Sequence, residues 1–254
     1  MNINGKTAIV TGGASGLGEA AVISLYNAGA NVVIADLNEE RGKIVAEKLG
    51  SKAIFVKTNI ASSDDAKAVC KAAMEKFGAI HILVNNAGLG TIGKTMGKNG
   101  PLDINVFKKT IEVNLIGSFN MLSNVAWEMN KNEAENLEKG VIINTASVAA
   151  FEGQIGQVSY AASKAGIVGM TLPAARDLAK NLIRVCAIAP GIIDTPMLAL
   201  VPEPVRESLA KQVPCPSRLG TPEEFGRLVQ HIVENGYLNG ECIRLDGAIR
   251  MGMQ

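Results

Sequence analysis

The chain alternates short runs of β-branched and aliphatic residues with longer stretches whose apolar residues recur at helical spacing. The short runs are almost continuously apolar, which is typical of parallel strands covered by helices on both faces. This alternation predicts strand–helix–strand units repeated around one parallel sheet. Seven strands are expected, at Thr7–Val10, Asn31–Ala35, Ala53–Val56, Ile82–Val84, Val141–Asn144, Ile183–Ile188 and Cys242–Leu245.

Six helices are expected between these strands. Pro173 falls inside the fifth of them and removes a backbone hydrogen bond, so this helix is expected to kink or split beyond about Met170. Two polar stretches, Leu89–Pro101 and Asn130–Gly140, are expected to be surface loops. Nothing in the sequence resembles a linker or a repeat, so residues 1–254 are interpreted as a single domain. The helices are expected at Leu17–Ala28, Glu39–Leu49, Ser63–Phe77, Val106–Met129, Tyr160–Leu178 and Glu223–Glu234.

Composition excludes several classes of function. The net charge of +1 lacks the positive field that draws proteins onto nucleic acid, so nucleic acid is not expected as a partner. His81 and His231 are the only histidines, and the four cysteines form no CxxC pair, so neither a metal site nor a Ser-His-Asp triad is expected. No apolar run approaches the ~20 residues of a membrane span. The chain is therefore expected to be soluble and cytoplasmic, without a signal peptide.

The first strand is followed by the glycine-rich sequence TGGASGLG, residues Thr11–Gly18, which opens the first helix. Glycines at such a junction permit a tight turn and let the backbone approach a pyrophosphate, which the free N–H groups of the helix start can bind. Glycine triplets also occur in ordinary turns, but the position between a strand and a helix favours a dinucleotide site. The sequence therefore predicts a Rossmann-type, doubly wound α/β fold.

Asp36 lies at the end of the second strand, eighteen residues beyond Gly18. A carboxylate there can accept hydrogen bonds from an adenosine ribose, and it would repel a 2′-phosphate. Leu37 and Gly13 offer no obvious cation to neutralise such a phosphate, so NAD is favoured over NADP. The alternative interpretation is that Asp36 caps the following helix.

Tyr160 and Lys164 are four residues apart on one helix, so they share a face, and Ser147 follows the fifth strand. A nearby ammonium and an oxidised nicotinamide would both favour the phenolate. Such a tyrosine could take a proton from a substrate hydroxyl while Ser147 orients the oxygen. An isolated Tyr and Lys at this spacing is more often a solvated pair. The catalytic interpretation depends on their occurrence with the glycine-rich loop, with NNAG at Asn85–Gly88 and with Asn114.

These motifs, with Pro190, Gly191 and Thr195, resemble those of the short-chain dehydrogenase/reductase family from end to end. The resemblance implies a homotetramer and the catalytic set Asn114, Ser147, Tyr160 and Lys164, in which Asn114 supports a water of a proton relay. The family usually has an Asp before an apolar residue at the adenine pocket, where this chain has Asn59 and Ile60, so NAD affinity is expected to change modestly at most. The implied coenzyme contacts are Gly12, Ser15, Gly16, Leu17, Gly18, Asp36, Leu37, Asn59, Ile60, Asn86, Ala87, Gly88, Tyr160, Lys164, Pro190, Gly191, Ile193 and Thr195.

Several longer stretches are similar to the type II 3-hydroxyacyl-CoA dehydrogenases within that family: residues Ile143–Gln157, Gly169–Ala179, Pro216–Gly220 and Leu238–Met251. This similarity implies reversible, NAD-dependent oxidation of an L-3-hydroxyacyl-CoA to the 3-oxoacyl-CoA, with activity on steroids or other alcohols as a further option. The implied substrate contacts are Ser147, Gln154, Gln157 and Tyr160.

Two loops are expected to meet this substrate. Lys94 and Lys98 could bind the phosphates of coenzyme A, although solvated loop lysines are an equal alternative. The segment Thr195–Arg218 is apolar but carries four prolines, so a mobile lid is favoured over a long core helix. Rival functions are another NAD-dependent secondary-alcohol or hydroxysteroid dehydrogenase, a 3-oxoacyl-carrier-protein reductase, or a silent NAD-binding module.

Overall fold

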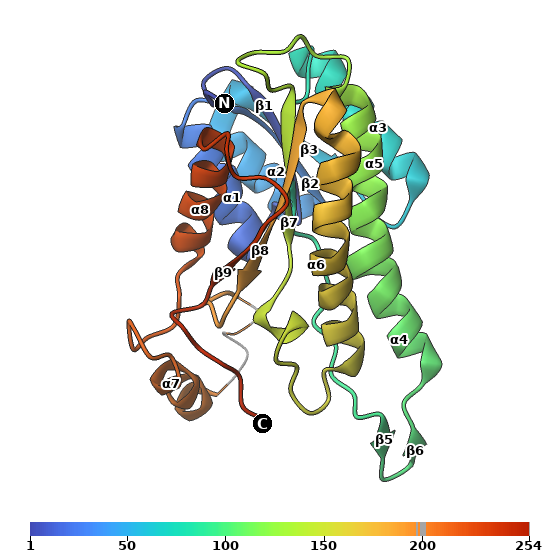
Figure 1. Ribbon diagram of the computed structural model, residues 1–254, viewed down its shortest axis with the longest axis vertical. Helices are drawn as coiled ribbons and strands as arrows, with labels where there is room; N and C mark the ends of the chain where they lie inside the picture. Colours follow the sequence, from blue (N-terminus) through green and yellow to red (C-terminus); the bar gives the residue numbers. More distant parts are fainter. Residues whose placement is uncertain (197, 199–201, 254) are drawn as a thin grey trace.

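A seven-stranded parallel sheet forms the centre of the computed structural model, which describes residues 1–196, 198 and 202–253 (Figure 1). The strand order β3-β2-β1-β4-β7-β8-β9 reverses between β1 and β4. Ligands of such sheets bind where the order reverses, at the carboxyl ends of the strands. The expected α/β fold is confirmed. The strands span Thr7–Thr11 (β1), Asn31–Asp36 (β2), Ala53–Lys57 (β3), Ile82–Asn85 (β4), Gly140–Thr145 (β7), Ile183–Pro190 (β8) and Cys242–Leu245 (β9).

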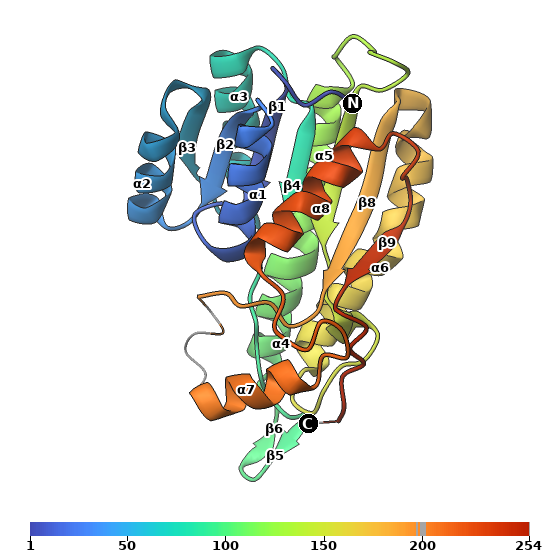
Figure 2. The same cartoon turned by 90° about the vertical axis from the view of Figure 1, so that its left-hand side faces the viewer.

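Helices cover both faces of the sheet, as Figures 1 and 2 show together. Strand residues are buried on both faces: Ala8 and Val10 of β1 enter one apolar core, and Ile9 between them enters the other. The first core lies beneath α1 (Gly16–Asn27), α2 (Glu39–Leu49) and α8 (Pro222–Glu234). The second lies beneath α3 (Ser63–Phe77), α5 (Ser118–Met129) and α6 (Val158–Leu178).

The single helix expected at Val106–Met129 is interrupted, which corrects that prediction. It consists of α4 (Ile104–Ile111), a π-helical turn at Glu112–Gly117 and then α5. Gly117 ends this turn against Ile60, and a Cβ added to Gly117 would lie 2.7 Å from the Ile60 Cγ1 atom. A π turn inserts one residue into a helix and re-aims the side chains around it. Asn114 lies within this turn.

Pro173 does not split α6, which was one of the two outcomes expected from sequence. The helix continues from Val158 to Leu178 with the proline inside it. The proline leaves the carbonyl of Gly169 without its usual helical donor. Gly169 and Pro173 are both exposed, and nothing lies within 4 Å of a Cβ added at Gly169, so water can reach this part of the helix.

Irregular segments gather at the carboxyl edge of the sheet, the lower end of Figures 1 and 2. The Leu89–Pro101 stretch, expected as a plain loop, contains a hairpin of β5 (Met96–Gly97) and β6 (Gly100–Pro101). The segment after β8 contains the helix α7 (Glu203–Lys211), which was not predicted from the sequence. Within the described part of the chain, none of the helices is both long and apolar enough to cross a membrane.

Candidate active site

The glycine-rich loop packs backbone to backbone against the segment after β4. Gly12 has a φ of +65°, and a Cβ there would lie 2.9 Å from the Ala87 Cα atom. A Cβ at Gly18 would lie 2.0 Å from the Gly12 carbonyl oxygen, so both positions exclude a side chain. The N–H groups of Asn86 and Ala87 donate to Thr11 Oγ1 over 3.0 and 3.1 Å. The two predicted motifs therefore meet where the strand order reverses.

The start of α1 is built to receive an anion. Ser15 occupies the N-cap in an extended conformation, and its side chain makes no capping hydrogen bond. The first N–H groups of a helix have no intrahelical acceptor and carry the positive end of the helix dipole. Gly16 faces the segment after β8, because a Cβ there would lie 3.7 Å from Pro196 Cδ and 3.8 Å from Thr195 Cβ. A glycine-rich loop beside a helix start whose first N–H groups lack intrahelical acceptors fits the pyrophosphate of a dinucleotide.

Asp36 lies beside this loop at the end of β2. Its Oδ2 atom accepts a hydrogen bond from the Ala14 N–H over 3.0 Å, and Oδ1 accepts one from the Asn38 N–H over 2.9 Å. Asn38, not Asp36, caps α2, because its side chain accepts from the Arg41 N–H. The capping alternative for Asp36 is therefore wrong. Leu37, next to Asp36, is 63% exposed.

The residues expected at the adenine lie in the segment after β3. Ile60 is buried, and Asn59 is exposed. The Asn59 Oδ1 atom accepts a hydrogen bond from the Ala61 N–H over 3.1 Å, which stabilises the turn. An amide oxygen has two acceptor positions, so one remains for the exocyclic amine of an adenine.

Lys164 is buried and donates a hydrogen bond from Nζ to the Thr145 carbonyl over 2.7 Å. Burial lowers the pKa of this amine to about 8, because a charged ammonium loses its hydration in a protein interior. A Cβ added to Gly88 would lie 3.6 Å from Lys164 Nζ and 3.2 Å from Asn114 Oδ1. The amine and the Asn114 amide therefore converge on the glycine of the NNAG motif.

Asn114 is fully buried and its side-chain hydrogen bonds hold two elements together. Oδ1 accepts from the Leu89 N–H over 2.7 Å, and Nδ2 donates to the Leu89 carbonyl over 2.9 Å and to Ser163 Oγ over 3.0 Å. Ser163 in turn donates to the Tyr160 carbonyl over 2.7 Å. Asn114 thus ties the loop after β4 to the helix that carries Tyr160 and Lys164.

Lys164 Nζ lies 5.8 Å from the centre of the Tyr160 ring, and the Ser147 side chain is close enough to Tyr160 to act on its pKa. Ser147 stands in an extended conformation two residues after β7, where its Oγ also accepts from the Ala149 N–H. Burial raises the pKa of Tyr160, and the Ser147 side chain opposes this only in part. The positive charge expected from Lys164 and an oxidised nicotinamide would have to overcome this effect of burial.

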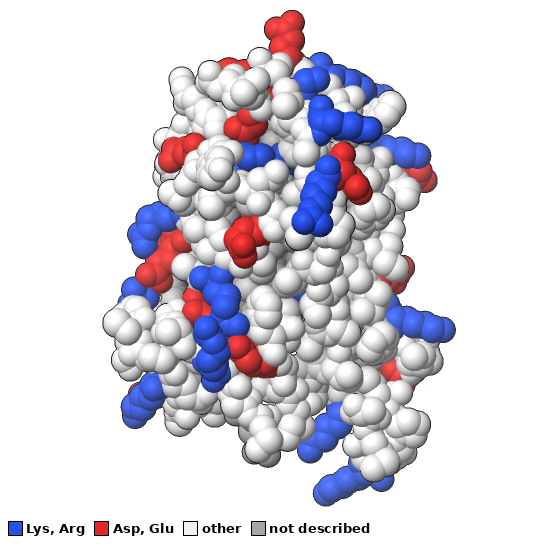
Figure 3. Space-filling model, viewed as in Figure 1, with Lys and Arg blue, Asp and Glu red and all other residues white. Residues whose placement is uncertain are grey.

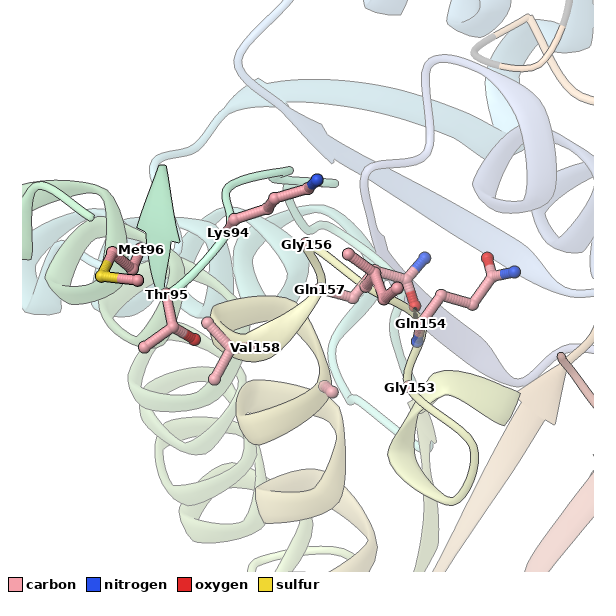
Figure 4. Close-up of a pocket in the computed structure, with 10 residues that line it drawn as sticks. Lys94, Thr95, Met96, Gly153, Gln154, Gly156, Gln157 and Val158 are labelled. Atoms are coloured by element: carbon pink, nitrogen blue, oxygen red, sulfur yellow. Dashed lines mark hydrogen bonds between the residues drawn. The ribbon is translucent and has the colours of Figure 1, made fainter. Parts of the chain in front are cut away.

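A cavity of about 470 Å³ lies at the start of α6 (Figure 4), and its lining includes none of Tyr160, Ser147 and Lys164. The two predicted glutamines line it, and the Gln157 Oε1 atom accepts from the Gln154 N–H over 3.0 Å. Lys94 lines the same cavity, whereas Lys98 lies in the turn of the β5–β6 hairpin and is not among the lining residues. The cavity reaches Ala161, the neighbour of Tyr160, from the outer side of α6.

One cluster of charges was not singled out from sequence. Arg244 in β9 forms two hydrogen bonds of 2.9 Å with the carboxylate of Glu152 and one of 2.7 Å with Asp246. It also lies 5.2 Å from the centre of the Phe151 ring. The Ile155 N–H donates to the Met253 carbonyl over 3.0 Å. The C-terminal segment therefore holds the loop that carries Gln154 and Gln157. In the sequence, this contact was indicated only by a charged residue, Arg244, within an otherwise apolar strand.

The segment expected as a lid is fixed at both ends. The Asp194 N–H donates to the Gly220 carbonyl over 2.8 Å, and the Cys215 N–H donates to the Gly247 carbonyl over 3.2 Å. The helix α7 within this segment has no buried residue among those described, so it is not a core helix. Leu198 and Leu209 are described, and the other apolar residues expected in the lid, Met197, Leu200 and Val201, lie outside the described residues.

Comparisons with known proteins agree with this geometry. A family model described as short chain dehydrogenase matches residues 6–205. The 3-hydroxyacyl-CoA dehydrogenase type-2 of Bos taurus is 52% identical over 253 residues, which cover 98% of this chain and 97% of that protein. The solved structure of 3-hydroxyacyl-CoA dehydrogenase type-2 from Mycobacterium avium has a TM-score of 0.95 at 45% identity and covers 98% of both chains. The structure of 3-ketoacyl-(acyl-carrier-protein) reductase from Brucella melitensis complexed with NADH has a TM-score of 0.88 at 30% identity, covering 97% of this chain and 98% of that one.

Proposed function

This chain belongs to the short-chain dehydrogenase family and is an oxidoreductase that uses a nicotinamide dinucleotide, and we propose that it interconverts L-3-hydroxyacyl-CoA and 3-oxoacyl-CoA with NAD. The observation that carries this proposal is the convergence of Tyr160, Ser147 and Lys164 beside the glycine-rich loop. The substrate class follows from the relatives that match nearly the whole chain and are named for it. We place the reaction in a reducing compartment such as the cytoplasm, because the four cysteines of the described chain are free thiols.

The residues at the carboxyl ends of β1, β2 and β4 would hold the coenzyme. The loop Gly12–Gly18 receives the pyrophosphate, and Asp36 accepts hydrogen bonds from the adenosine ribose. Lys164 donates to the hydroxyls of the second ribose, and Ile193 with Thr195 binds the carboxamide. When bound, the oxidised coenzyme accepts the hydride from the carbinol carbon and adds positive charge beside Tyr160.

Tyr160 acts as the general base in the oxidation direction. Its buried ring has a raised pKa, so it needs additional positive charge to become a phenolate near neutral pH. The phenolate then accepts the proton of the substrate hydroxyl as the carbon gives up hydride. Ser147 orients the same oxygen, and in the reverse direction it polarises the ketone while Tyr160 returns the proton.

Lys164 carries the proton away from Tyr160. Its lowered pKa, about 8, lets the amine exchange protons near neutral pH without a strong base. Asn114 positions this amine through the loop after β4, and with a water it completes the relay toward solvent. Both of its side-chain N–H groups are engaged with Leu89 and Ser163, so its main contribution is to hold the geometry, and one acceptor position of Oδ1 remains for that water.

The substrate enters from the cavity beside α6. Gln154 and Gln157 contact the acyl part, and Lys94 meets the phosphates of coenzyme A at the cavity edge. The segment Thr195–Arg218 closes over the bound substrate as a lid of this single domain. The hydrogen bonds of Asp194 and Cys215 would anchor this lid to the rest of the domain.

We propose that the chain forms a homotetramer, because apolar side chains are exposed on the helices α5 and α6. Ile116, Phe119 and Leu172 are exposed on the π turn, α5 and α6. Figure 3 shows a largely uncharged area over the middle of α5 and α6, whereas charges of both signs are scattered around it. An apolar area of this kind is typical of a surface that another protein chain covers. Sedimentation at micromolar concentration should give four times the chain mass, and a monomer mass would contradict the proposal.

The decisive experiment follows NADH oxidation with acetoacetyl-CoA, a steroid ketone and a simple ketone in parallel. We expect the highest kcat/KM with acetoacetyl-CoA. A preference for the steroid or the simple ketone would indicate another secondary-alcohol dehydrogenase. A preference for NADPH with a carrier-protein substrate would indicate a reductase of that class. Coenzyme binding without turnover of any of them would indicate a silent binding module.

A further inference from the structure

A cation that no sequence pattern indicated lies beside the coenzyme loop. The Arg41 side chain reaches back from the first turn of α2, and its Nε donates to the Ala14 carbonyl over 3.3 Å. The N–H of the same Ala14 is bound by the Asp36 carboxylate over 3.0 Å. Asp36 and Arg41 therefore bind the N–H and the carbonyl of the same residue in the glycine-rich loop. The guanidinium therefore contacts the same loop residue as the carboxylate that we assign to the adenosine ribose.

Glu19 neutralises this cation. The Arg41 Nη2 atom lies 2.7 Å from Glu19 Oε2, and the Glu19 carboxylate comes from the first turn of α1. The Glu19 side chain is 25% exposed and that of Arg41 is 47% exposed, so the pair lies at the rim of the loop and can be opened by a ligand. Of the two carboxylates near the loop, Glu19 pairs with the guanidinium and Asp36 binds the Ala14 N–H.

The other cations of this corner are also engaged. Lys43 and Lys57 both contact Glu39, at 2.8 and 3.4 Å, and all three side chains are well exposed. Arg41 is distinguished from them because its guanidinium contacts the loop itself. A guanidinium is permanently charged and binds phosphate through two parallel hydrogen bonds, which an ammonium cannot do.

We propose that Arg41 is a latent binding residue for a ribose 2′-phosphate, and that Glu19 determines coenzyme choice by holding Arg41 in an ion pair. The inference rests on the proposed use of NAD at this site. Asp36 repels the 2′-phosphate, and Glu19 occupies the guanidinium that contacts the loop and could compensate for this repulsion. Removing the negative charge from Asp36 opens the site to NADP, and removing that of Glu19 as well makes Arg41 available to the phosphate.

The test measures binding of adenosine 2′,5′-bisphosphate and of adenosine 5′-monophosphate by calorimetry, without any turnover. The starting variant is Asp36→Asn, which keeps an oxygen acceptor for the Ala14 N–H. Three double variants are built on it by adding Glu19→Gln, Arg41→Ala or Lys43→Ala. The Lys43→Ala variant is the matched control, because it removes one cation from the same helix that contacts Glu39 and not the loop. Thermal unfolding establishes that each variant is folded.

Relative to Asp36→Asn alone, we expect Glu19→Gln to lower the Kd for the bisphosphate about tenfold, because a charge-assisted contact replaces the ion pair. Arg41→Ala should raise that Kd about tenfold, and Lys43→Ala should leave it within about twofold. None of the additions should change the Kd for the monophosphate by more than about twofold. Equal Kd values for the Arg41→Ala and Lys43→Ala variants would overturn the inference.

The wild-type protein separates this inference from the proposal on which it rests. It should bind NAD more tightly than NADP. A wild-type preference for NADP would overturn the proposed use of NAD. A wild-type preference for NAD, together with bisphosphate binding that does not respond to Arg41, overturns only the role of Arg41 and Glu19. If Asp36→Asn fails to fold, the single variants Glu19→Gln and Arg41→Ala should still shift the Kd for NADP in opposite directions, and shifts of the same sign would contradict the inference.

Discussion

Lys164 donates its hydrogen bond to the main-chain carbonyl of Thr145, the last residue of β7, and not to a carboxylate. A neutral acceptor compensates only part of the hydration that a buried ammonium loses. The pKa of Lys164 is lowered to about 8 for this reason. The catalytic helix is thus fixed to the sheet by an amine that can be either charged or neutral near physiological pH.

This relationship predicts a pH-dependent cost in stability. The Lys164 amine has a pKa of about 8 in the folded protein, against an ordinary value of 10.5 for a lysine in water. Between these values the unfolded chain binds more protons, so the contribution of Lys164 to the free energy of unfolding rises with pH. The loss of folding stability caused by burying the charged amine is complete below about pH 8 and disappears toward pH 10. Denaturant unfolding measures the free energy of unfolding of Lys164→Met and of the wild type at both pH values. The difference, variant minus wild type, should be larger at pH 7 than at pH 10 by roughly 1–3 kcal/mol. A difference that does not change with pH would contradict the lowered pKa.

A second prediction concerns the proton of the substrate hydroxyl. Tyr160→Phe keeps the buried ring and removes the acid–base group, so kcat should fall by about 10²–10⁴. The Kd for NADH, measured by fluorescence, should change by less than about threefold, because Phe preserves the packing of α6. Tyr237→Phe is the matched control, since Tyr237 is 100% exposed and far along the chain from the site. A Tyr160→Phe enzyme with the wild-type kcat would remove Tyr160 from the mechanism.

The strands and the site motifs were predictable because their signals are local. The run of apolar residues in β1 ends at Thr11, and the next residue needs a positive φ that glycine supplies. Ala8, Ile9 and Val10 are all fully buried, so hydrophobic runs and true strands coincide within one or two residues. The spacing of Tyr160 and Lys164 is likewise fixed by one helix.

The remaining features depend on tertiary contacts that no local pattern contains. Pro173 should break a helix, yet α6 continues because the affected carbonyl faces solvent. The π turn around Asn114 depends on bonds to Leu89 and Ser163, far away in sequence. The guanidinium of Arg41 reaches the loop only because α1 and α2 begin beside each other. Solvent exposure decided the first of these cases, and long-range hydrogen bonds decided the other two.

A third prediction concerns Arg244 as a positioning residue for the loop that carries Gln154. Arg244→Lys keeps the charge but cannot form both hydrogen bonds to Glu152, so the loop should lose its fixed position. The KM for acetoacetyl-CoA should rise about threefold to tenfold, with the Kd for NADH within about twofold. Glu152→Gln should have a similar effect, and the double variant should cost less than the sum of the two. Additive effects would show that the two residues act independently.

Lys94 and Lys98 provide a last prediction, because they are matched in type and lie four residues apart in the same hairpin region. Lys94 lines the cavity with Gln154 and Gln157, whereas Lys98 is not among the lining residues. If the cavity receives coenzyme A, Lys94→Glu should raise the KM for acetoacetyl-CoA by about tenfold, because a carboxylate would then repel the phosphates. Lys98→Glu makes the same change of charge on the same segment and should raise this KM by less than about twofold. The effect of Lys94→Glu should shrink at high salt, since the lysine acts through a screened charge. Equal KM values for the two variants would mean that general charge, and not a phosphate contact at Lys94, attracts the substrate.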